Sequence, residues 1–171
     1  MKRSCVVPAL SILWLAPLSA QEAAPPPPPP DYDEVVFEAK LRGQPIAAWS
    51  LFVDGSGVWS EFEQEDGAPA YQYTRIYREI ERGVTNYVGL ERILRQLPND
   101  VPDYDRCEQR VTDAAYGTIR MTSGARTIEL AWNSGCFDED YRAFMQTLTE
   151  ADRYVAALGE DGRAMRTEKV E

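Results

Sequence analysis

Histidine is absent from the 171-residue chain, and its absence excludes several kinds of active site. Without imidazole there is no Ser-His-Asp or Cys-His machinery, no histidine ligand for zinc and no general base of the kind most often used near neutral pH. The Gly55–Gly57 stretch does not supply a phosphate-binding loop, because it lacks the lysine and the length of such a loop and is typical of a hairpin turn. Any catalytic chemistry would therefore depend on carboxylates.

Cysteine occurs only three times, at Cys5, Cys107 and Cys136. Cys5 falls in the N-terminal apolar run, so an exported form keeps one pair, and an even count in an oxidising compartment predicts a Cys107–Cys136 disulfide. Its loop of 28 intervening residues is worth roughly 3 to 4 kcal/mol by the chain-entropy estimate. A redox-active pair is the alternative, but the pair lacks the Cys-x-x-Cys spacing of redox motifs. An oxidised pair also removes thiolate nucleophiles and thiolate metal sites.

Long apolar runs are limited to the N-terminus, where Cys5–Leu18 covers 14 residues and contains two prolines. A membrane-spanning helix needs about 20 apolar residues. Lys2 and Arg3 precede the run and small residues close it at Ala20, which is the pattern of a secretory signal peptide over 1–20. We therefore expect export to the bacterial periplasm or the extracellular medium, with no stable membrane anchor after cleavage.

Six consecutive prolines, Pro25–Pro30, follow the predicted signal peptide. The segment 21–30 is polar or small and then all proline, so it cannot form a hydrogen-bonded helix and favours an extended polyproline II rod. At about 3.1 Å per residue the prolines span roughly 19 Å, which predicts a semi-rigid extended linker. A ligand for a proline-recognising domain and a cell-wall spacer are the alternatives.

Acidic residues outnumber basic ones, 28 against 18, which gives a formal net charge of −10 that becomes −12 once the signal peptide is removed. An acidic surface repels nucleic acid and anionic lipid headgroups, so neither is an expected partner. A basic envelope protein or a glycan suits this charge better. Four acidic residues close together offer oxygen ligands for calcium, but their spacing misses the EF-hand pattern, and a solvated acidic loop is the favoured interpretation. They are Asp100, Asp103, Asp105 and Glu108.

Hydrophobic periodicity divides the chain into strands and helices. Two-residue alternation or β-favouring composition predicts strands at 35–42, at 47–53 and 58–64 around a turn, at 71–82, at 116–122 and at 126–132. Apolar stripes at helical spacing predict helices between Thr85 and Pro98 and from Asp138, as N-cap, to Gly159. The segment 71–82 also fits helical spacing, but its Tyr, Thr and Ile residues favour a strand.

The order of these elements, with strands in runs rather than alternating with helices, predicts an α+β fold. We expect an antiparallel sheet of about five or six strands with two helices packed on one face and one disulfide. A single α+β domain would span 31–159, followed by a charged C-terminal tail over 160–171.

Aromatic side chains crowd into the first half of this domain, beside acidic residues. The candidate binding surface consists of Trp49, Trp59, Tyr71, Tyr73 and Tyr77. Such side chains are enriched at interfaces and sugar-contacting surfaces, because they bury much area at low entropic cost. The alternative is that they fill the core of the sheet. Strand alternation places Trp59 on the same face as Glu61 and Glu63, which leaves the cover of Trp59 open.

These features favour a binding or envelope-support role over catalysis, and no catalytic residue, metal site or cofactor is indicated. A carboxylate-dependent glycan hydrolase is one alternative, since glycoside hydrolysis needs only two carboxylates about 5 to 10 Å apart. A proteinaceous inhibitor of a cationic envelope enzyme such as lysozyme is the other. It rests on an analogy of charge and compartment.

Overall fold

The computed structural model describes residues 31–64, 66–67, 69, 71–98 and 100–170 of the chain. The predicted signal peptide and linker lie outside the described residues. In chain order the elements are β1 (Glu34–Leu41), β2 (Gln44–Phe52), β3 (Gly57–Glu63), β4 (Tyr73–Ile80), α1 (Val84–Leu94), the 3₁₀ helix η1 (Tyr104–Arg106), β5 (Tyr116–Ser123), β6 (Arg126–Asn133), α2 (Glu139–Gly159) and β7 (Ala164–Val170).

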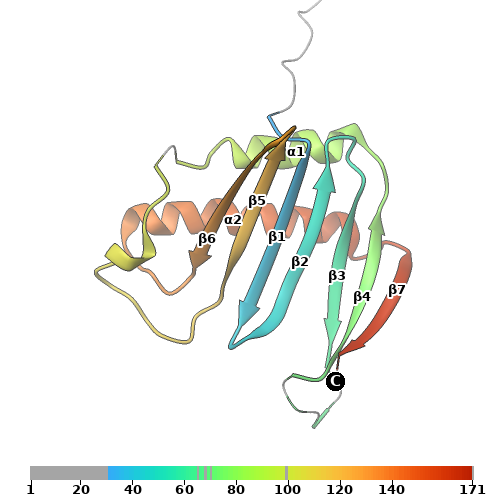
Figure 1. Ribbon diagram of the computed structural model, residues 1–171, viewed down its shortest axis with the longest axis horizontal. Helices are drawn as coiled ribbons and strands as arrows, with labels where there is room; N and C mark the ends of the chain where they lie inside the picture. The colour runs from blue at the N-terminus through green and yellow to red at the C-terminus, as the bar shows by residue number, and fades with distance from the viewer. Residues whose placement is uncertain (1–30, 65, 68, 70, 99, 171) are drawn as a thin grey trace, which may run out of the picture.

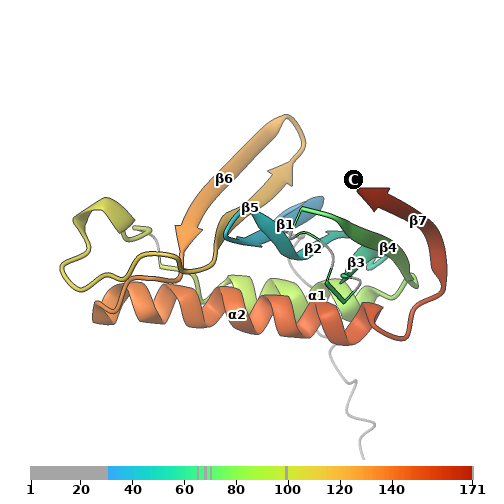
Figure 2. The ribbon, with the colours of Figure 1, turned by 90° about the horizontal axis from the view of Figure 1, so that it is seen from below.

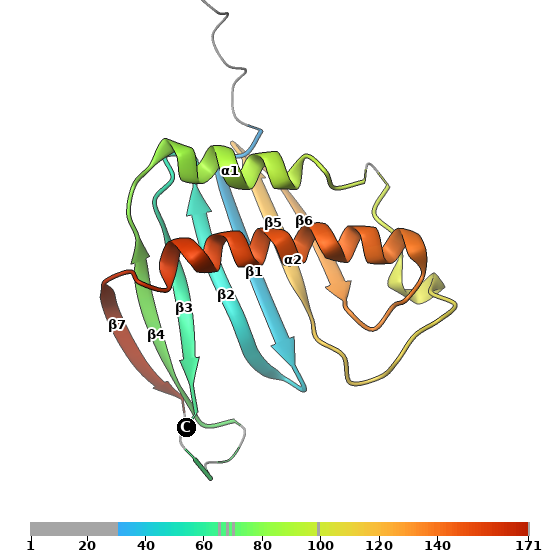
Figure 3. The same ribbon diagram turned by 180° about the vertical axis from the view of Figure 1, so that it is seen from behind.

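The strands form one antiparallel sheet in the order β6-β5-β1-β2-β3-β4-β7 (Figure 1). Both α-helices cross the same face of this sheet, with α2 over the middle of the strands and α1 over one end (Figure 3). At the two ends of the sheet the β5–β6 hairpin and β7 rise away from the helices (Figure 2). We call the covered side the helix face and the other side the open face.

The structure confirms the predicted α+β class, with two helices on one face of an antiparallel sheet. All the predicted strands are present, including β4 in the segment 71–82. The predicted count of five or six strands is wrong, because β7 adds a seventh within the segment 160–171 that we expected to be a tail. None of the helices in the described part of the chain combines the length and the apolar character that crossing a membrane requires.

β7 has no apolar face, which is why periodicity does not detect it. Its sequence, AMRTEKV, leaves every side chain exposed except that of the half-buried Val170. Pairing with β4 holds the strand in place, with Tyr73 opposite Val170 and Tyr77 opposite Arg166. The C-terminal segment therefore belongs to the sheet.

Three stacked aromatic rings form the centre of the core. The ring of Phe37 lies between those of Trp49 and Trp132, with centroid distances of 5.3 Å and 5.5 Å and interplanar angles of 14° and 13°. All three side chains are at most 6% exposed, and α2 adds Phe144 and Leu148 to the same buried cluster. The stack ties β2, β1 and β6 together beneath the helix.

Gly117 makes room for this stack. Its strand, β5, lies between β1 and β6, and a Cβ at position 117 would lie 2.8 Å from Cζ2 of Trp132 and 1.8 Å from the carbonyl oxygen of Glu38. Real Cβ atoms do not approach their neighbours this closely. Only glycine therefore lets the Trp132 indole lean across β5 toward Phe37.

The two indole N–H groups of the stack differ in their partners. Trp49 donates from Nε1 to Oδ1 of Asp152 on α2 at 3.0 Å. Nε1 of Trp132 is buried and has no acceptor among the described residues. An unsatisfied buried donor costs about 1 to 3 kcal/mol. Only one of the two indole groups is hydrogen-bonded, so the packing of the rings must offset this cost.

The predicted hairpin of β2 and β3 is confirmed, and Asp54 holds its turn. The carboxylate accepts hydrogen bonds from the hydroxyl (2.6 Å) and the backbone N–H (2.9 Å) of Ser56 and pairs with Arg82. These bonds, that of the Ser56 hydroxyl first, lower the pKa of Asp54 to about 2. Gly55 supplies the positive φ, 77°, that the turn requires.

Replacing Phe37 with alanine removes the central ring of the stack, and we expect the free energy of unfolding to fall by about 3 to 5 kcal/mol. Phe52→Ala is the matched control. Phe52 lies on the neighbouring strand but is 42% exposed, so its truncation should cost less than about 1 kcal/mol. Urea denaturation measures both, and equal costs would contradict a central role for the stack.

Candidate functional site

A loop connects the end of α1 to the start of β5 and carries η1 and Cys107. The predicted Cys107–Cys136 disulfide is present, and it links this loop to the segment before α2, with the two Cα atoms 5.9 Å apart. The backbone N–H of Val111 also donates to the carbonyl of Gly135 at 2.8 Å. The loop is therefore joined to the start of α2 by a covalent bond and by backbone hydrogen bonding.

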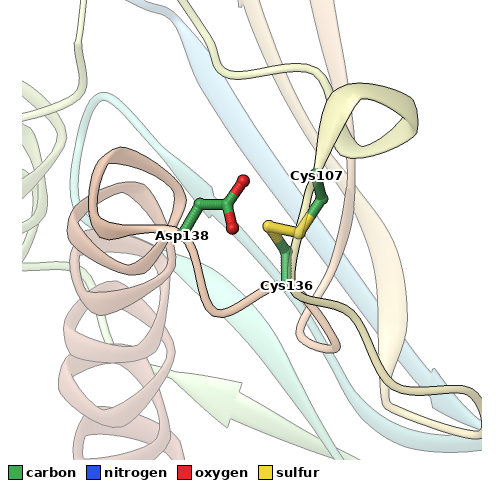
Figure 4. A group of neighbouring side chains, drawn as sticks. All are labelled: Cys107, Cys136 and Asp138. Atoms are coloured by element: carbon green, nitrogen blue, oxygen red, sulfur yellow. A yellow bond between two sulfur atoms is a disulfide. The ribbon is translucent and has the colours of Figure 1, made fainter.

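Asp138 adds a further connection between the same segments. The sequence predicts it as the N-cap of α2, and it occupies that position, but its side chain makes no capping hydrogen bond. The carboxylate instead accepts the backbone N–H groups of Glu108 (2.9 Å) and Gln109 (3.1 Å). Figure 4 shows it beside the disulfide. Sequence cannot reveal this use of Asp138, because its partners lie about thirty positions away.

Cys107, Cys136 and Asp138 place three potential metal-ligand atoms within 4.8 Å of one another. The two sulfur atoms are bonded to each other, so neither is a thiolate that could bind a cation. In this oxidised form the group acts as a clamp that holds the loop against α2. We call these three residues the clamp.

Beside the clamp, a groove of about 920 Å³ opens between the loop and α2. Five carboxylates line it, against one cation, Arg106. They belong to Asp100, Asp103, Asp138, Asp140 and Glu150. We call this the acidic groove.

The carboxylates of the acidic groove differ in what neutralises them. Asp103 pairs with Arg106 at 3.6 Å and accepts the N–H of Asp105. Asp140 lies in the first turn of α2, where a negative charge is also favourable to the helix dipole. Asp100 and Glu150 are exposed and have no ion-pair or hydrogen-bond partner among the described residues. These two leave the groove with uncompensated negative charge.

The five aromatic residues predicted as a binding surface do not form one patch. Trp49 is 3% exposed and belongs to the core stack. Trp59 is half-buried on the helix face, and α2 ends so close to it that a Cβ at Gly159 would lie 2.3 Å from the Trp59 Cβ. Glu61 shares this face and pairs with Arg78 at 2.6 Å. The cover of Trp59 is thus the last turn of α2, which places both tryptophans beneath the helices.

The predicted tyrosines lie elsewhere. Tyr71 is exposed in the turn before β4, whereas Tyr73 and Tyr77 lie on the open face of β4. Three residues outside the predicted binding surface contact Tyr73 or Tyr77 or lie between them. Together they form what we call the aromatic–arginine cluster, which consists of Phe62, Tyr73, Arg75, Tyr77 and Arg166.

The members of this cluster differ in how readily sequence could have identified them. Arg75 alternates with Tyr73 and Tyr77 along β4, so two-residue periodicity would have placed it on the same face. Arg166 comes from β7, which has no hydrophobic pattern. Only the pairing of β7 with β4 brings Arg166 to Tyr77.

Comparison with known proteins identifies no relative: no family model, no curated protein and no solved structure matches the chain. Function is therefore inferred from the two places described above. The acidic groove lies between the loop and α2, and the aromatic–arginine cluster lies on the open face of the sheet.

Asp152 provides a test of the electrostatics beneath α2. Burial raises its pKa above the ordinary value of 3.8, while the hydrogen bond from Trp49 opposes the shift. A carboxyl with a raised folded-state pKa contributes stability below its unfolded pKa and loses it as the pH rises through the folded-state pKa. Asparagine keeps an acceptor and cannot ionise, so Asp152→Asn should gain stability relative to wild type as the pH rises from 4 to about 7.

The measurement is urea denaturation of both proteins across this pH range. Asp161→Asn, which removes an exposed carboxylate beyond the end of α2, controls for the change in net charge. A difference between Asp152→Asn and wild type that does not change with pH would show that the Asp152 carboxyl does not titrate differently in the two states.

Loss of the disulfide should release the loop. For Cys107→Ser/Cys136→Ser we expect the free energy of unfolding to fall by about 3 to 4 kcal/mol, because the unfolded chain regains the entropy of the closed loop. Hydrogen exchange at the Val111 amide should accelerate, since its bond to Gly135 depends on the same junction. Asp138→Ala, with the disulfide intact, should cost less, about 1 to 3 kcal/mol. Unchanged exchange at Val111 in the double variant would show that the hydrogen bonds alone hold the loop.

Proposed function

We propose that this protein is an exported, non-catalytic binding protein whose acidic groove holds a cationic segment of a basic partner protein. One observation carries the proposal. A groove of about 920 Å³ has Asp100 on its loop side and Glu150 on its α2 side, and neither carboxylate has a partner among the described residues. A lysine or arginine side chain between them would meet negative charge from both walls.

The other residues of the groove suit the same occupant. Charge-assisted hydrogen bonds are about twice as strong as neutral ones, so a guanidinium or ammonium group gains most from the carboxylates. Val101 and Pro102 also line the groove, are half-buried and offer apolar surface for the aliphatic stem of such a side chain. The volume lies within the usual range of about 300 to 1,000 Å³ for ligand pockets.

The clamp supports binding by keeping the groove in one shape. Ordering a mobile loop on association costs about 0.5 to 1.5 kcal/mol for each immobilised side chain. The disulfide and the two hydrogen bonds to Asp138 hold the loop before any partner arrives. The loop wall of the groove is therefore fixed near the clamp before binding.

The proposed location and the alternative functions follow from the same features. A disulfide is favoured in an oxidising compartment, which supports export. An inhibitor of a cationic envelope enzyme would be one instance of the proposed binding. The glycan-hydrolase alternative has less support. A general acid needs a carboxyl with a raised pKa. Burial raises the pKa of Asp152, but this carboxyl accepts a hydrogen bond from Trp49 and does not line the groove.

The test uses the oxidised protein as bait in its native envelope extract, at low and at high salt, with mass spectrometry of what is retained. Asp100→Asn/Glu150→Gln removes one unpaired charge from the loop side of the groove and one from the α2 side. We expect it to retain a basic partner about ten-fold less well than wild type does, because rim and groove charges contribute strongly to association at low salt. High salt should release the partner from wild type.

Glu160→Gln/Asp161→Asn is the matched control. It removes the same number of charges from exposed positions just beyond α2, away from the groove. It should retain the partner as wild type does. A partner that both double variants retain equally, or no basic protein on the wild-type bait, would overturn the proposal.

A further inference from the structure

The aromatic–arginine cluster lies on the opposite side of the sheet from the acidic groove. The helices stand on one side of the sheet (Figure 2), whereas the cluster is built from open-face positions of β3, β4 and β7. No helix or loop of the described part of the chain covers this face where the cluster lies. Its chemistry is therefore independent of the groove.

Arg75 is the centre of the cluster. Its guanidinium carbon lies 5.4 Å from the ring centroid of Phe62 and 4.5 Å from that of Tyr77, so the side chain is held between two rings. Nε donates to Oγ of Ser60 at 3.1 Å, and Ser60 is only 2% exposed. Two rings and one hydrogen bond thus hold the guanidinium in place before any ligand binds.

Tyr77 places a second cation next to the first. The guanidinium carbon of Arg166 lies 4.1 Å from the Tyr77 centroid. The Tyr77 hydroxyl donates to Oε2 of Glu168 at 2.8 Å, and Arg166 donates to the same oxygen at 3.3 Å. Glu168, which stands opposite Arg75 in the register, is therefore already engaged by these two residues.

The terminal nitrogens of Arg75 are left without a carboxylate. No ion pair joins Arg75 to any described residue, and its one hydrogen bond uses Nε. A half-buried guanidinium usually meets an acidic partner, but here the nearby carboxylate of Glu168 pairs with Arg166 and leaves Arg75 without one. The cluster is locally cationic, although the chain has a formal net charge of −10.

We propose that the aromatic–arginine cluster is a binding site for the carboxylate group of a small ligand. The unpaired edge of Arg75 donates to the carboxylate, and Arg166 adds a second positive charge. A planar monoanion matches one guanidinium edge and balances the net positive charge of Arg75, Arg166 and Glu168, whereas a phosphate dianion would leave an excess negative charge. The rings of Phe62 and Tyr73 meet edge to face, with their centroids 5.8 Å apart. They offer apolar surface beside Arg75 for the body of the ligand.

Two sources can supply such a carboxylate, namely a sugar acid and an amino acid. The experiment titrates the oxidised protein with a uronic acid trisaccharide and, separately, with a glutamate dipeptide, and follows arginine Nε–H and backbone amide signals by NMR. The neutral trisaccharide and the glutamine dipeptide are the uncharged controls, and both dipeptides have blocked termini so that only the glutamate side chain carries a charge. We expect at least one carboxylate probe to shift the signals of Arg75 and Tyr77, and the responding probe identifies the source.

Variants separate binding from folding. Arg75→Gln should weaken the responding probe about ten-fold or more, because a charge-assisted hydrogen bond is lost. Arg120→Gln is the matched control, since Arg120 lies on the open face of β5 and already pairs with Glu129 at 3.8 Å. It should change the affinity less than about two-fold.

Arg166→Gln keeps the test decisive if Arg75→Gln does not fold. The Arg166 side chain is 65% exposed, so its replacement should leave the fold intact and weaken the probe several-fold. Three results would overturn the proposal. Neither carboxylate probe shifts the cluster at millimolar concentration, the neutral controls bind equally well, or the cluster variants bind as Arg120→Gln does. None of these results bears on the acidic groove, whose variants lie on the helix face.

Discussion

Phe37 lies between two tryptophans beneath α2, and this stack sets the arrangement of everything around it. Its rings come from β1, β2 and β6, so their contact requires β5 to pass beneath the Trp132 indole without a side chain at position 117. Trp49 then bonds to Asp152, which fixes α2 over the same strands. Because one face of the sheet is occupied in this way, the opposite face is left for solvent.

The two candidate sites use opposite charges on opposite sides of one sheet. The acidic groove has unpaired carboxylates on the helix face, whereas Arg75 and Arg166 give the open face a local positive charge. Charges more than about 8 to 10 Å apart at an exposed surface are largely screened at physiological ionic strength. The net charge of the chain therefore describes its long-range behaviour, while local pairing decides what each site can bind.

Both sites are held rigid, but by different means. In the groove, a disulfide and two hydrogen bonds to Asp138 fix the loop to the start of α2. In the cluster, Arg75 is held by ring stacking and by one hydrogen bond to a buried serine. In the cluster the charged group itself is oriented, whereas in the groove the loop is fixed near the clamp, and either restraint would lower the entropic cost of binding a ligand.

Local pattern by itself determined most of the elements of this protein. Alternation in β1, the turn at Asp54 and the apolar stripe of α2 each depend on residues close together in the chain, so they predicted the strands, the hairpin and the helix correctly. The paired cysteines likewise predicted the disulfide. Such signals survive because the burial of one face imposes a regular spacing on the sequence.

Only the tertiary structure decided which of these residues meet. β7 has no regular spacing of buried side chains that a sequence pattern could reveal. Only its register against β4 brings Arg166 onto Tyr77. Asp138 has the sequence of a helix cap but bonds to a loop about thirty residues away. Trp59 shares a face with acidic residues, yet α2 covers it. Contacts between distant segments depend on the packing of the whole sheet, and local spacing contains no record of that packing.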